Sequence, residues 1–93
     1  MTEDVFKAAF SLNLRKAIKN TGMTPMLVSK YSGISRSTIY NYMKGTRLPD
    51  LYNLFKLAEI LCVRPEELID FDEYGLESSI FNEGDDIYGQ VRE

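Results

Sequence analysis

The most informative stretch of this chain reads TPMLVSKYSGISRSTIYNYMKG, residues 24–45, and it predicts two helices joined by a tight turn. Thr24 can cap a helix with its hydroxyl group, and Pro25 suits the first helical position because no hydrogen bond is needed from its nitrogen there. We therefore expect a helix from residue 25 to about residue 31. The pattern then breaks at Gly33, which can adopt the positive φ of a tight turn between two steeply crossing helices.

A second helix of the same stretch is predicted over residues 36–44. Ser35 can cap its first turn, and Gly45 can end it in the left-handed conformation. The crossing of the two helices also needs a small side chain at their contact, which Ser29 supplies. We expect three apolar side chains to be buried beneath this pair, namely Val28, Ile34 and Ile39. The opposite face of the second helix is then left pointing outward.

Upstream of this stretch, apolar residues recur every four positions, which is the spacing of one face of a helix. The stripe consists of Phe6, Phe10, Leu14 and Ile18. We expect this first helix to end between residues 20 and 22, ahead of the cap at Thr24.

Downstream of the stretch, two more helices are predicted. Asp50 can cap the first of them, which a broad apolar stripe places from residue 51 to about residue 61. Pro65 and the two glutamates after it indicate a short last helix, closed by Leu68 and Ile69. Five short helices and no strand predict an all-α fold.

The charges of the 93-residue chain divide into two blocks of opposite sign, although the net charge is only −3. Residues 1–65 carry ten bases and four acids, a balance of +6, whereas residues 66–93 carry one base and ten acids, a balance of −9. A basic block can meet phosphates, and an acidic tail is usually a solubilising or interaction segment. We expect a helix-turn-helix domain over residues 1–70 and an acidic C-terminal extension over residues 71–93. The extension also holds large apolar residues, so we expect it to pack on its own domain or on a second copy.

The chain has few of the residue types that catalysis or metal binding requires. It has no histidine and one cysteine, Cys62, which excludes an internal disulfide and a structural zinc site. No nucleophile–base pair and no phosphate-binding glycine loop can be recognised, so we expect no enzyme activity, no cofactor and no metal. We expect Cys62 to be a packing residue at a helix end.

No apolar run is long enough to span a membrane, and the first residues carry acids where a secretory signal carries bases. These two features predict a cytoplasmic protein.

Residues 24–45 resemble the helix-turn-helix of the Cro and phage-repressor family, which includes the xenobiotic-response-element-type regulators. The resemblance extends through LAEILCV and PEEL near the end of the predicted domain, so that it covers about residues 7–69. Its implied fold is a compact five-helix phage-repressor-like DNA-binding domain. The matching positions of the motif, which contains no insertion, are Thr24, Val28, Ser29, Gly33, Ile34, Ser35, Thr38, Ile39, Tyr42 and Gly45.

The resemblance implies a sequence-specific regulator of transcription, a repressor, that binds double-stranded DNA as a homodimer and places the helix at residues 36–44 in the major groove. An α-helix fits that groove, where arginine can pair with guanine and asparagine with adenine. By position, the implied base-contacting residues are Arg36, Ser37, Tyr40 and Asn41. The implied phosphate-contacting residues are Thr24, Thr38, Lys44, Thr46 and Arg47.

Each of these assignments has an alternative. Arg36, Lys44 and Arg47 can be ordinary solvated charges, and Tyr40 can be a surface tyrosine without a partner. Tyr42 is expected to be wedged against the helix that starts at residue 51.

The whole chain also has an alternative interpretation. It can be a protein-interaction module, in which the acidic tail binds a partner as antitoxins with this fold bind toxins.

Two departures from the family pattern bear on the site. Pro25 stands where many relatives carry a glutamine that contacts phosphate, so that contact is lost. Ile18 and Met43 stand where the family often buries an arginine against a glutamate. Because both replacements are apolar, we expect these two side chains to be largely buried and to touch each other.

Overall fold

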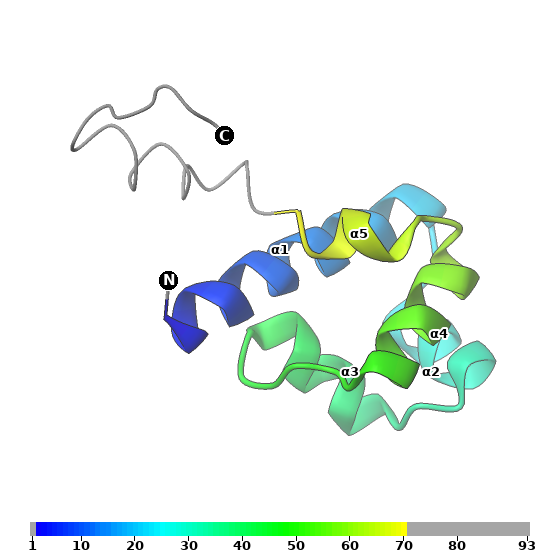
Figure 1. Ribbon diagram of the computed structural model, residues 1–93. Coiled ribbons are helices and arrows are strands. Elements are labelled where there is room, and N and C mark those ends of the chain that lie inside the picture. Colours follow the sequence, from blue (N-terminus) through cyan, green and yellow to red (C-terminus); the bar gives the residue numbers. More distant parts are fainter. Residues whose placement is uncertain (1, 71–93) are drawn as a thin grey trace.

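Five α-helices make up residues 2–70, the part of the chain that the structure, a computed structural model, describes (Figure 1). No strand occurs within these residues, so the predicted all-α fold is confirmed. The predicted ends of the second, third and fourth helices agree with the structure to within one residue. The helices are α1 (Glu3–Thr21), α2 (Pro25–Ser32), α3 (Arg36–Lys44), α4 (Leu51–Leu61) and α5 (Pro65–Leu68).

Local signals fix where α2, α3 and α4 begin and end. The three predicted caps, Thr24, Ser35 and Asp50, each accept a hydrogen bond from the backbone N–H three residues later, at 3.2, 3.2 and 2.8 Å. Gly33 and Gly45 end α2 and α3 with φ of 78° and 80°, a conformation that a side chain would strain. The turn between α2 and α3 is therefore set by the sequence, as expected.

The core lies where α1, α3 and α4 meet, with α2 and α5 closing its ends (Figure 1). Val28, Ile34 and Ile39 are all buried in it, as predicted. Ser29 has the small contact expected at the helix crossing, where its hydroxyl donates to the carbonyl of Ile34 at 2.6 Å. The contact holds the chain tightly as it leaves the turn.

Tyr42 is the largest fully buried side chain and joins α3 to both of its neighbours. Its ring meets the edge of Phe10 on α1, with centroids 6.0 Å apart and planes at 83°. Its hydroxyl accepts a hydrogen bond from the side-chain amide of Asn53 on α4 at 3.2 Å. The prediction that Tyr42 packs against the fourth helix is confirmed.

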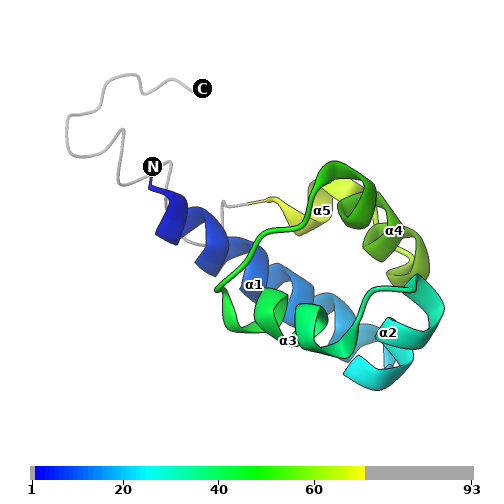
Figure 2. The same cartoon turned by 90° about the horizontal axis from the view of Figure 1, so that it is seen from below.

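α3 runs alongside α1 (Figure 2). The hydroxyl of Ser11 donates to the carbonyl of Met43 at 2.5 Å, close to the end of α3. Ile18 is buried, and Met43 is partly buried and packs against the core, which agrees with the predicted burial of both. The last turn of α3 lies near the edge of the core, where solvent reaches it. Direct contact between Ile18 and Met43 stays a prediction.

α5 is held against α1 by Asn13, a buried residue that no sequence pattern singles out. The Asn13 amide donates to the carbonyl of Leu68 at 3.2 Å and to that of Asp70 at 2.7 Å. Leu68 is buried, whereas Ile69 lies just outside the helix and is 40% exposed. Of the two residues expected to close α5, Leu68 alone is packed in the core.

Cys62 lies at the end of α4, as expected, but it is exposed rather than packed. It is the only non-glycine residue within residues 2–70 with positive φ, at 58°. Its N–H bonds the carbonyls of Ala58 and Glu59, and the left-handed turn directs the thiol to solvent. The expectation of a packing role was wrong because the cap conformation turns the side chain away from the core.

None of the described helices has both the length and the apolar composition needed to cross a bilayer. The expected packing of the acidic extension concerns residues 71–93, which lie outside the described residues.

Candidate nucleic-acid interface

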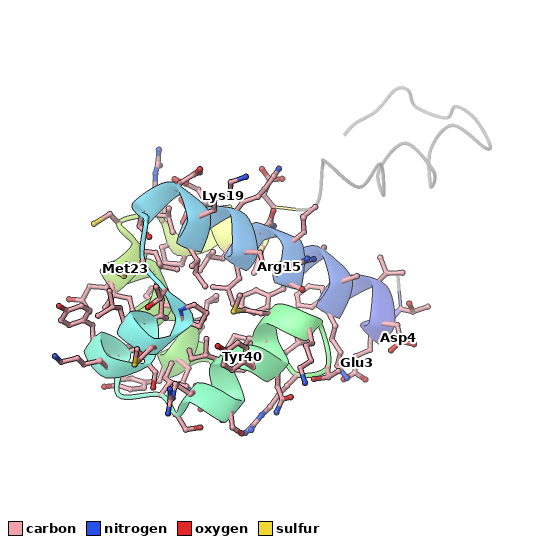
Figure 3. All side chains as sticks on the ribbon, turned by 180° about the vertical axis from the view of Figure 1, so that it is seen from behind. Glu3, Asp4, Arg15, Lys19, Met23 and Tyr40 are labelled. Carbon is pink, nitrogen blue, oxygen red and sulfur yellow. The ribbon has the colours of Figure 1, made fainter. Side chains whose placement is uncertain are left out.

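The buried residues of α3 determine which of its residues face solvent. Ile39 and Tyr42 are buried, so the residues on the opposite side of the helix are left toward solvent. These residues are the four predicted base contacts, Arg36, Ser37, Tyr40 and Asn41, which we call the α3 face. Three of them are exposed, and Asn41 is half-buried. In Figure 3, Tyr40 lies on α3 beside the part of α1 that carries Arg15.

Asn41 is half-buried because Thr46 folds back over it from the linker. The N–H of Thr46 donates to the carbonyl of Asn41 at 3.0 Å, and its hydroxyl lies 3.2 Å from the same carbonyl. The hydroxyl is also 3.4 Å from the side-chain oxygen of Asn41. A predicted phosphate contact therefore touches a predicted base contact.

Thr38, at the start of α3, contacts two other side chains through its hydroxyl group. Its hydroxyl oxygen accepts from the hydroxyl of Ser35 at 2.9 Å and from the guanidinium of Arg47 at 3.5 Å. Arg47 lies in the linker after α3, so the contact brings it back to the first turn of the helix. Two predicted phosphate contacts, Thr38 and Arg47, are thus placed side by side.

Thr24 lies at the start of α2 and is exposed. Its hydroxyl oxygen already accepts from the N–H of Leu27, which leaves its proton available for an outside acceptor. A helix start also presents unpaired N–H groups and the positive end of the helix dipole. This position can therefore bind an anion even though Pro25 has replaced the family's glutamine.

The predicted cations of the interface have no acidic partner within residues 2–70. Arg36, Lys44 and Arg47 are exposed, and no carboxylate of these residues lies within ion-pair distance of them. Other bases are paired, as Lys7 is with Glu3 at 3.4 Å and Arg64 is with Glu66 at 3.7 Å. The surface around α3 is therefore a basic one that can accept phosphates.

No cluster suitable for a metal ion occurs in the described part of the chain, where three or more His, Cys, Asp or Glu side chains never gather.

Two contacts in the site could not be predicted from single positions of the sequence. Thr46 with Asn41 and Arg47 with Thr38 are joined by the path of the linker, and no spacing rule predicts that path.

Residues 14–68 match the protein-family model described as helix-turn-helix, HTH_3. Among solved structures, the restriction-modification controller protein C.AhdI from Aeromonas hydrophila is 31% identical with a TM-score of 0.63, and the alignment covers 72% of this chain and 98% of that one. An HTH_3 family transcriptional regulator from Vibrio cholerae has a TM-score of 0.71 at 22% identity, over 83% of this chain and 43% of that one, and therefore shows a shared fold alone. A search of curated proteins gives no match.

Proposed function

The chain belongs to the helix-turn-helix family HTH_3, and from this premise we propose that it is a cytoplasmic transcriptional repressor that binds a specific double-stranded DNA site through α3. The family consists of non-enzymatic DNA-binding proteins, which agrees with the absence of enzyme activity expected from the sequence.

The proposal rests on two features seen together: nothing in residues 2–70 covers the α3 face, and the cations around it have no acidic partner within that range. Arg36, Ser37 and Tyr40 are exposed on a helix short enough to lie across one major groove. Arg36 can donate two N–H groups of its guanidinium to guanine O6 and N7. Such a contact distinguishes one base pair from another, so Arg36 is the strongest candidate for sequence recognition.

The phosphate contacts in the proposal are Thr24, Thr38, Lys44, Thr46 and Arg47. These residues lie at the start of α2, on α3 and in the linker after it, which brackets the α3 face on both sides. Contacts to phosphate fix the orientation of a protein on the duplex without distinguishing its sequence. They also make binding weaken as the salt concentration rises. A protein cation that binds phosphate releases counterions from the DNA, and this release is less favourable in high salt.

We propose further that two copies bind together. One α3 contacts only a half-site, and a two-fold dimer doubles the contact with a palindromic operator. C.AhdI is a restriction-modification controller protein, and control of gene expression is a matching role for this chain.

The experiment is selection of bound sites from a pool of random duplexes by the purified full chain. Enrichment of a dyad-symmetric sequence, together with repression of a reporter that carries this sequence in its promoter, is the expected result. Enrichment of a single half-site would contradict the dimer, and activation of the reporter would contradict repression. If no sequence is enriched, the DNA-binding proposal is wrong for this chain and the protein-interaction alternative takes its place.

A further inference from the structure

α4 presents an apolar face that nothing in the described part of the chain covers. Leu51, Tyr52 and Phe55 are 71%, 69% and 54% exposed, and they lie within about one turn of each other on the helix. We call these three residues the α4 face. Isolated exposed apolar residues are common, but a contiguous group marks an interaction surface.

The α4 face continues into an apolar groove between α1, the linker and the end of α5. The walls of the groove include Phe6, Leu48, Pro49 and Leu54, and Leu51 belongs to both the groove and the α4 face. The polar surface in the groove is very small, so the surface suits an apolar occupant better than a polar ligand.

The chain leaves the described domain at the edge of this groove. Ile69 lines the groove, and the residues on both sides of it, Leu68 and Asp70, have their carbonyls held by the amide of Asn13. The described part of the chain therefore ends beside the groove. The 23 residues of 71–93 can reach ~75 Å when extended, which is far more than the ~17 Å length of α4.

Residues 71–93 have the composition that this surface would bind. They carry seven acids and one base, and they also carry large apolar residues at intervals. The apolar members are Phe71, Tyr74, Leu76, Ile80, Phe81, Ile87, Tyr88 and Val91. A segment that was only a solvated tail would not need them.

One cation beside the α4 face also suits this segment. The ammonium group of Lys56 lies 5.6 Å from the ring centre of Tyr52. A carboxylate of the acidic segment can pair with this ammonium group while neighbouring apolar side chains cover the α4 face.

We propose that residues 71–93 dock onto the α4 face and the adjoining groove of their own chain, with apolar side chains in the groove and a carboxylate toward Lys56. The covalent link gives the segment a high effective concentration at the surface, so that modest contacts suffice. The proposal does not depend on the identity of the DNA site.

The test is backbone ¹⁵N relaxation of the full chain at several protein concentrations. In the wild type, a run of residues within 71–93 is expected to have order parameters near the rigid value of about 0.85, independent of concentration. In Phe55→Asp, the same run is expected to fall below about 0.6, because a carboxylate replaces an apolar anchor and repels the acidic segment. Tyr31→Asp on α2 is the matched control, since Tyr31 is 57% exposed and lies away from the groove, and it should leave the order parameters unchanged.

A second variant keeps the test valid if Phe55→Asp unfolds the domain. Phe81→Ser leaves residues 1–70 unaltered and is expected to lower the order parameters in 71–93 and to shift the resonances of Leu51, Tyr52 and Phe55. Order parameters in 71–93 that are low in the wild type, or that stay the same in both variants, overturn the proposal. Resonances of the α4 face that shift with concentration, with a dimer in sedimentation and a flexible 71–93, also overturn it and place a second copy on the α4 face.

Discussion

The α3 face and the α4 face are both exposed sides of short helices, but they differ in how favourably water hydrates their side chains. The α3 face carries Arg36 and Ser37 beside a half-buried Asn41, so it is well hydrated without a partner. The α4 face carries Leu51, Tyr52 and Phe55, whose exposure is unfavourable until something covers them. Exposure alone therefore does not identify an interface. The charged face exposes groups that can bind anions, whereas the apolar face exposes side chains that another segment or molecule can still bury.

The largest effect should separate the buried and exposed sides of α4. Leu57 is fully buried and Leu51 is 71% exposed, although both are leucines of the same helix. Leu57→Ala should lower the free energy of unfolding by about 2–5 kcal/mol, because it removes buried methyl groups and leaves a cavity. Leu51→Ala, the matched control, should lower it by clearly less, because only the proposed docking of residues 71–93 would cover this side chain. Urea denaturation of the full chain measures both, and equal losses would contradict the expected difference between the two sides of α4.

The next effect tests how the end of α3 sits against α1. Met43→Glu should destabilise the domain by about 2 kcal/mol, because the half-buried site would hold a carboxylate without a partner. Adding Ile18→Arg should recover much of this loss if the two side chains touch. Thermal unfolding of the single and double variants gives the coupling. A double variant no more stable than Met43→Glu alone would show that Ile18 and Met43 are too far apart to interact.

A comparable effect, in binding rather than stability, is expected on the α3 face. Arg36→Ala should weaken binding to the selected operator by about 1–3 kcal/mol and leave affinity for random duplex nearly unchanged, because Arg36 contacts a base. Fluorescence anisotropy with both duplexes at one salt concentration measures the difference. Equal loss on both duplexes would make Arg36 a phosphate contact.

The smallest effect concerns Lys44, which contacts phosphate in the proposal. Lys44→Ala should weaken specific and random DNA together and reduce the slope of log affinity against log salt by about 1. A salt titration with each duplex measures the slope, and Lys30→Ala is a control at an exposed lysine on α2 outside the proposed contacts. A slope that stays at the wild-type value would remove Lys44 from the interface.

The helices and the turn between α2 and α3 could be predicted from the sequence alone. Thr24, Ser35 and Asp50 cap helices, and Gly33 and Gly45 end them, through interactions that span three or four residues. Local hydrogen bonds of this kind are encoded in adjacent residues, so they can be predicted without knowing the rest of the fold. Periodicity likewise assigned Ile39 and Tyr42 to the buried side of α3, and with them the outward side that carries the predicted base contacts.

Features that join distant residues became known only with the assembled fold. Asn13 holds α5 from 55 residues away, and Thr38 is reached by Arg47 through a bend in the linker. The same is true of Met43, half-buried at the edge of the core, and of Cys62, whose cap conformation turns it to solvent. The apolar α4 face also emerged only from the assembled fold. Its stripe predicted burial, but α4 is covered on one side alone, because how much of a broad stripe is buried depends on where the neighbouring helices lie.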